Sequence, residues 1–78
     1  MKREVSVNTA AMFQFLAADG KYAKIRWVTT GDEEKCLIRV LNPGVIELIR
    51  ENENSSNASR IYPKDAGRKV KVIEVFDQ

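Results

Sequence analysis

Histidine is absent from this chain of 78 residues, which removes the commonest general base, proton shuttle and metal ligand of proteins. The one cysteine, Cys36, cannot form an internal disulfide, so the chain is not a disulfide scaffold and a cytoplasmic location is expected. The four glycines stand apart from one another, and none belongs to a phosphate-binding loop. These absences predict a protein that is not an enzyme and that holds no cofactor and no metal.

Long hydrophobic runs and a strong net charge are also missing. No stretch approaches the roughly 18 apolar residues of a membrane-spanning helix, so no membrane partner is expected. The 13 cations nearly balance the 11 anions, and a net charge of +2 points to no particular partner. An apolar content of 44% with 31% charged residues is ordinary for a folded protein of this length. We therefore expect one domain over residues 1–78.

The N-terminal third predicts a short edge strand followed by a helix. Residues 3–7 alternate in the manner of an extended segment, and residues 9–18 form an apolar run that ends before Gly20. Gln14 is the only polar side chain between residues 10 and 18, and a helix that is apolar all round is normally buried on more than one side. Phe13 lies off the expected core stripe of Met12, Phe15 and Leu16. It is therefore a candidate interface residue, unless it packs beneath the polar loop that follows residue 51.

Residues 22–41 contain two segments in which apolar and polar side chains alternate, and this pattern predicts a β-hairpin. Pairing Ile25 with Ile38 and Trp27 with Cys36 gathers the core-type side chains on one face. That register makes residues 30–33 the hairpin loop.

In the second half of the chain, the sequence does not decide whether residues 43–51 form a helix or a strand. Residues 43–51 fit a short helix after Asn42 and Pro43, yet they also alternate as a strand. Residues 51–59 are rich in Asn and Ser and predict a mobile polar loop. Residues 69–76 carry apolar side chains on both faces, which favours a central strand.

Together these elements predict an α+β fold. In it, the hairpin 22–41 and the C-terminal strand 69–76, with a possible edge strand at 3–7, form a small antiparallel sheet. One short helix at 9–18, or two if residues 43–51 are also helical, packs on this sheet. If residues 45–50 are instead a strand, the alternative is a helix followed by a five-stranded SH3-like or Sm-like small barrel.

The outer face of the hairpin is the candidate binding surface. Its residues are Tyr22, Lys24, Arg26, Lys35, Leu37 and Arg39. In the predicted register Lys24 lies opposite Arg39, and like charges that face each other across a sheet are unfavourable. Glu74 on the last strand would neutralise them internally. Alternatively, they bind an acidic protein or phosphates, with a base stacked on Tyr22 as on sheets that bind single-stranded nucleic acid.

Two functions follow from these features. The first is a small non-catalytic binding module, a protein-interaction regulator or inhibitor that acts by occupying the surface of a protein partner. The second is a nucleic-acid-binding domain that uses the basic hairpin face, with an affinity that falls steeply as salt rises. The apolar helix and any unpaired sheet edge also suggest a homodimer.

Overall fold

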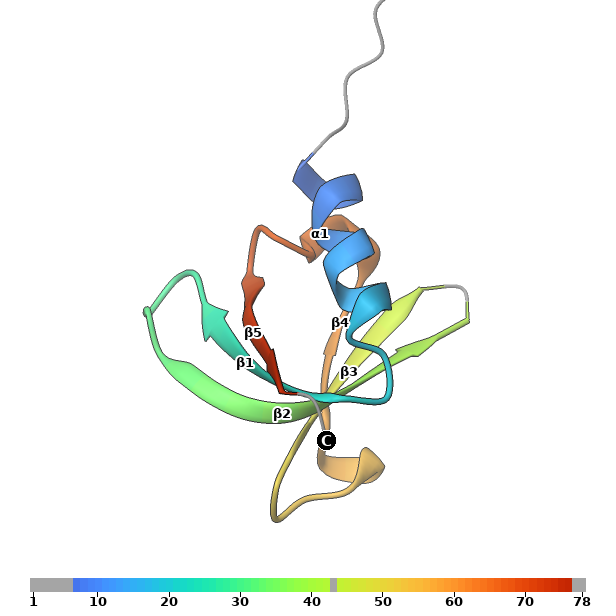
Figure 1. Cartoon of the computed structure of the whole chain (residues 1–78), viewed down its shortest axis with the longest axis vertical. Coiled ribbons are helices and arrows are strands. Elements are labelled where there is room, and N and C mark those ends of the chain that lie inside the picture. The colour runs from blue at the N-terminus through green and yellow to red at the C-terminus, as the bar shows by residue number, and fades with distance from the viewer. Residues whose placement is uncertain (1–6, 43, 77–78) are drawn as a thin grey trace, which may run out of the picture.

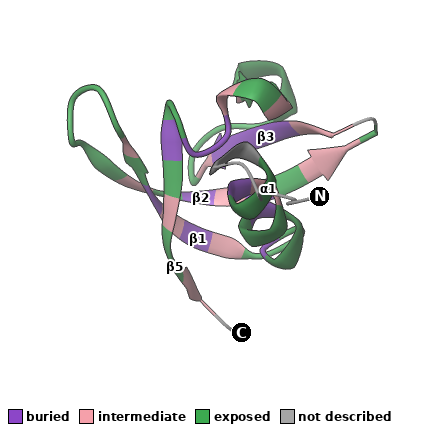
Figure 2. Cartoon of the chain, turned by 90° about the horizontal axis from the view of Figure 1, so that it is seen from above, coloured by how far each residue is buried: buried purple, intermediate pink, exposed green. Residues whose placement is uncertain are grey.

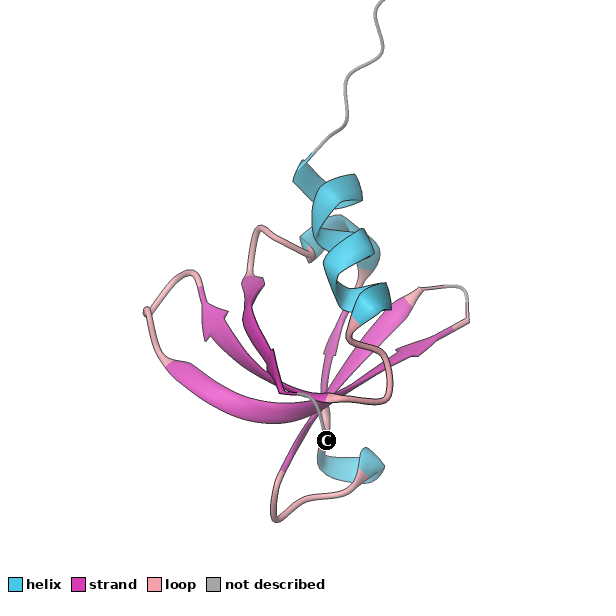
Figure 3. Ribbon diagram, in the orientation of Figure 1, coloured by secondary structure: helices cyan, strands magenta, loops and turns pink. Residues whose placement is uncertain are grey.

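The computed structural model describes residues 7–42 and 44–76, with the backbone alone for residues 7 and 8. One α-helix, α1 (Val7–Ala17), precedes five strands (Figure 1). The strands are β1 (Tyr22–Trp27), β2 (Glu33–Leu41), β3 (Val45–Arg50), β4 (Ser59–Ile61) and β5 (Val70–Phe76). Two short 3-10 turns, η1 (Ser55–Asn57) and η2 (Pro63–Asp65), flank β4 (Figure 3). The predicted α+β class is confirmed.

The five strands form one antiparallel sheet in the order β4-β3-β2-β1-β5. The sheet curls strongly, and α1 lies across one end of the curl (Figure 1). The C-terminal strand lies where it was predicted along the chain, but it pairs only with β1 and is therefore at an edge of the sheet. Its apolar side chains lie in two different environments: Val70 is buried in the core, and Phe76 pairs with Tyr22 on the outer face.

The predicted second helix at 43–51 is wrong, because residues 45–50 form β3 between β2 and β4. Four consecutive residues of β3, from Ile46 to Ile49, are buried. A strand covered on both faces loses the clean alternation that distinguishes it from a helix in sequence. The predicted edge strand at 3–7 lies outside the described residues except for Val7, which is the first residue of α1.

The hairpin has the predicted faces but a different register. Ala23 lies opposite Cys36 and Ile25 lies opposite Glu34. The four-residue loop is 28–31, closed by a hydrogen bond of 2.7 Å from the Gly31 amide to the carbonyl of Trp27. Gly31 has a φ of +81°, a left-handed conformation that glycine adopts without steric cost. The need for glycine at the last loop position thus moves the loop two residues toward the N-terminus, and the predicted loop at 30–33 is wrong.

The core lies between α1 and the inner face of the sheet (Figure 2). From the helix and the residue that follows it, the core receives Ala11, Phe15 and Ala18, which recur at helical spacing. From the sheet it receives Ala23, Ile25, Cys36, Ile38, Ile46, Leu48, Ile61 and Val70. Leu16 was predicted to belong to the core stripe, but its side chain is 51% exposed.

Candidate binding surfaces

The six predicted binding-surface residues all lie on the outer face of β1 and β2. Tyr22 faces Leu37, and Lys24 faces Lys35. Arg39 is two positions farther along β2 from Leu37 and lies opposite Glu47 of β3, so the predicted pair of Lys24 with Arg39 is wrong. The structure therefore brings five of the six residues together and leaves Arg39 beyond them.

Carboxylates of β2 and of the turn after β3 neutralise most of the cations on this face. The Arg26 guanidinium donates to Glu33 at 2.6 and 2.9 Å, and the Lys24 ammonium lies 3.9 Å from the same carboxylate. The hydrogen bond from Arg26 lowers the pKa of Glu33 below its usual value. Lys35 lies 3.7 Å from Glu51. The expected neighbour, Glu74, lies directly opposite Lys24 on β5, but within the described residues it forms no ion pair with Lys24, and Glu33 takes that place.

The aromatic ring on this face is already in contact with a cation of the protein. The Lys35 ammonium lies 5.5 Å from the centre of the Tyr22 ring and 5.2 Å from that of Phe76. Both distances are within the range of cation–π contacts. A base that stacks on Tyr22 would have to displace Lys35, so this face is poorly prepared to bind single-stranded nucleic acid.

Glu47 is a charged residue of the sheet whose burial the sequence did not reveal. It lies on the outer face of β3, only 3% exposed, with Arg39 and Arg60 opposite it on the two neighbouring strands. Its carboxylate is 3.6 Å from the Nε atom of Arg60. Within the described residues Arg39 forms no ion pair, so it is the least neutralised of the predicted surface cations.

A second polar cluster closes the inner face beyond the core. Glu34 accepts hydrogen bonds from Arg50 at 2.5 and 3.2 Å and from the indole N–H of Trp27 at 2.6 Å. Arg50 also donates to Ser59 at 3.2 Å, and the contacts of Arg50 and Trp27 lower the pKa of Glu34. Glu34 lies two residues before Cys36 and therefore on the core face of β2, and this spacing is the sequence signal that would have predicted its partial burial. The cluster is internally satisfied and structural.

The outward side of α1 is apolar and has no cover in the described structure. Phe13 is 65% exposed and Leu16 is 51% exposed. The alternative in which Phe13 packs beneath the polar loop at 52–60 is therefore wrong. A groove of about 360 Å³ adjoins Leu16 between the helix and the turn from β2 to β3. It is lined by Met12, Leu16, Val40, Leu41, Asn42 and Gly44.

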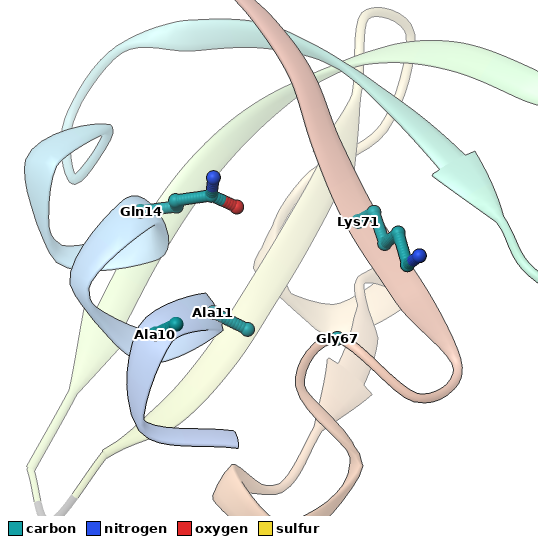
Figure 4. A pocket seen from close by; sticks show the side chains of 5 residues that line it. All are labelled: Ala10, Ala11, Gln14, Gly67 and Lys71. Atoms are coloured by element: carbon teal, nitrogen blue, oxygen red, sulfur yellow. The ribbon is translucent and has the colours of Figure 1, made fainter. Parts of the chain in front are cut away.

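A second, smaller hollow of about 270 Å³ lies on the other flank of α1, facing β5 (Figure 4). Ala10, Ala11 and Gly67 line it, and Gln14 points across it toward the strand. Lys71 borders the hollow, but its ammonium points away from the helix (Figure 4). The hollow thus offers one amide group and no charge directed inward.

Neither the side-chain chemistry of the described residues nor comparison with known proteins indicates a kind of site other than these surfaces. Over residues 7–42 and 44–76 there is no group of three His, Cys, Asp or Glu side chains arranged to bind a metal ion. The one cysteine, Cys36, is buried, which raises its pKa to about 11. None of the helices described has the length and hydrophobicity needed to span a membrane. Comparison with protein-family models, curated protein sequences and solved structures finds no match.

Proposed function

We propose that this protein is a small non-catalytic binding module that acts by occupying the surface of a protein partner, as a regulator or inhibitor does. The observation that carries the proposal is the exposed apolar face of α1, with Phe13 at 65% and Leu16 at 51% exposure. Residues 7–17 contain no charged side chain. Large apolar side chains without neighbouring charges are typical of the centres of protein interfaces.

The cationic face of the hairpin supports the nucleic-acid alternative less well. Its lysines and arginine already contact Glu33 and Glu51, and Lys35 covers the Tyr22 ring. An oligonucleotide would have to break these contacts before it gained its own. A partner that covers the apolar face of α1 has no such contacts to break. This difference favours a protein partner.

The proposed function is tested by isolating the tagged chain from its native cell as wild type, Phe13→Asp and Val28→Asp. Val28 is the matched control, because it is also an exposed apolar residue, at 44%, but lies in the hairpin loop far from α1 (Figure 1). We expect a protein to be retained by the wild type and by Val28→Asp and to be lost with Phe13→Asp. Retention that is abolished by nuclease, or that is equal in all three, contradicts the proposal.

The architecture itself favours the small-barrel interpretation. A helix followed by five antiparallel strands, each beside its predecessor except for β5, which returns to β1, is the element order expected of an SH3-like or Sm-like barrel. The strong curl of the sheet supports this assignment (Figure 1). Small barrels of this kind serve many unrelated functions, so the assignment does not by itself select a partner.

A further inference from the structure

We propose that Arg39 and Arg60 bind carboxylates of an extended acidic segment of a protein partner, across the outer face of β2, β3 and β4. The inference goes beyond the proposed function, because it adds a second contact surface on the face of the sheet opposite to α1 and states the charge of the partner. Three observations carry it: the row that the two arginines form with Glu47, the burial of Glu47, and the neutralisation of the other cations of β1 and β2.

Arg39, Glu47 and Arg60 form one row across three neighbouring strands. Arg39 on β2 and Arg60 on β4 each lie directly opposite Glu47, which is on β3 between them. All three side chains are on the outer face, because residues next to each of them in the sequence belong to the core. Neighbouring strands are about 4.8 Å apart, so the two arginines lie about 10 Å apart along the row. The sheet therefore sets the separation of the two guanidinium groups.

Burial makes the surface of this row more cationic than its composition indicates. The side chain of Glu47 is only 4% exposed, whereas that of Arg60 is 58% exposed. Glu47 contacts the Nε atom of Arg60 at 3.6 Å. Within the described residues the exposed side chain of Arg39 forms neither a hydrogen bond nor an ion pair. A partner that approaches the row therefore meets two guanidinium groups and almost none of the Glu47 carboxylate.

The other cations of β1 and β2 have no comparable excess of positive charge. They are paired with Glu33 and with Glu51. The unmatched positive charge on the outer face of β2, β3 and β4 therefore lies at Arg39 and Arg60. Complementary charge steers the approach of a partner and suppresses wrong partners. The row thus selects an acidic segment over a basic one.

The geometry favours a protein segment over a single strand of nucleic acid. Arginine binds a carboxylate through two parallel N–H···O bonds. The alternate side chains of an extended segment share a face and are about 7 Å apart, and the long arginine side chains can cover the difference from their own spacing. A single strand would also need a free ring on which to stack its bases, and Lys35 already covers the Tyr22 ring.

The test is the binding of a fluorescent peptide of alternating glutamate and serine to the full chain, measured by fluorescence anisotropy. We expect Arg39→Gln and Arg60→Gln each to weaken binding by about three- to fivefold, and added salt to weaken it further. Arg68→Gln is the matched control, because Arg68 is also exposed and forms no ion pair over the described residues, but lies in the turn before β5. We expect this control to leave the affinity unchanged.

Three results would overturn the proposal: a wild type that does not bind the peptide, an equal loss of affinity with Arg68→Gln, or tighter binding of an oligothymidylate that is lost with Arg39→Gln. An equal loss would mean that the peptide responds only to net charge. Arg39→Gln is the decisive variant, because Arg60 also contacts Glu47 within the fold. Phe13→Asp should leave peptide binding unchanged. A chain that binds the peptide through Arg39 but retains no cellular protein contradicts the proposed function and not this inference.

Discussion

Single residues show most clearly how the protein separates structural charges from surface charges. Glu33 and Glu34 are neighbours of the same type, yet their side chains point to opposite faces of β2. Glu33 forms exposed ion pairs with Arg26 and Lys24. Glu34 lies in a cluster in which its own side chain is 29% exposed and that of Arg50 is 32% exposed. Loss of the contact between Glu34 and Arg50 is therefore more costly than loss of the ion pairs of Glu33, because the partner that remains stays partly desolvated.

Replacement of the two glutamates separates these roles. We expect Glu34→Gln to lower the free energy of unfolding by about 1–2 kcal/mol, because Arg50 loses its charged acceptor in a partly buried site. Glu33→Gln, the matched control, should leave the denaturation midpoint nearly unchanged, because its ion pairs are exposed and screened. Urea denaturation followed by Trp27 fluorescence measures both. Equal effects of the two substitutions would show that Arg50 finds another acceptor.

The lowered pKa of Glu34 predicts how the stability of the protein changes with pH. Its contacts with Arg50 and Trp27 hold the pKa of Glu34 below its ordinary value of 4.5 in the fold. The unfolded chain therefore binds more protons in this range, so the stabilisation is complete above pH 4.5 and is lost as the pH falls through the lowered pKa. We expect Glu34→Gln to flatten the decrease in stability below that pH. A decrease as steep as that of the wild type contradicts this assignment.

At the scale of elements, α1 has two apolar sides with different roles. Phe15 is fully buried and Phe13 is 65% exposed, so the same substitution tests both sides. We expect Phe15→Ala to cost about 3–5 kcal/mol, because it leaves a cavity against the sheet. Phe13→Ala should cost less than about 0.5 kcal/mol. Thermal unfolding monitored by circular dichroism distinguishes the two, and a large loss with Phe13→Ala would place that ring in the core.

The elements also show which parts of the fold are readable from sequence. The helix, the hairpin faces and the span of the last strand were predicted correctly, because a period of 3.6 or 2 determines which side chains share a face. The predicted central place of the last strand was wrong, because β5 lies at an edge of the sheet. The register was not, since shifting the loop from 30–33 to 28–31 preserves those faces and only the glycine position distinguishes the two. β3 was ambiguous because its burial depends on β2 and β4, which the local pattern of residues 45–50 does not encode.

The candidate site was predictable to a similar degree. Phe13 stood out because one apolar stripe was enough to cover the core side of α1, and a second large side chain had no expected place there. The exposure of Leu16 was missed, because Ala18 rather than Leu16 completes the buried side. The alternation of the hairpin places its cations on the outer face, but their partners Glu33 and Glu51 depend on the register and on β3.

At the scale of the whole molecule, two surfaces are candidates for the binding site. The hairpin face has cations whose charges are largely matched by the carboxylates of Glu33 and Glu51. The face of α1 has apolar side chains that nothing in the described structure covers. Covering apolar surface is the dominant favourable term in protein association. We therefore propose that α1 is the main binding surface and that the hairpin cations matched by Glu33 and Glu51 have a structural role.

The most direct test of that assignment is the amide NMR spectrum of the labelled chain. It would be recorded before and after addition of the protein that the wild-type chain retains, and again after addition of a single-stranded oligonucleotide at physiological salt. The proposal predicts that the protein partner shifts the amides of α1, and that the oligonucleotide leaves the amides of residues 22–26 and 33–39 unchanged. Amides of α1 that do not respond to the protein partner, together with hairpin amides that move with the oligonucleotide, would contradict the proposal.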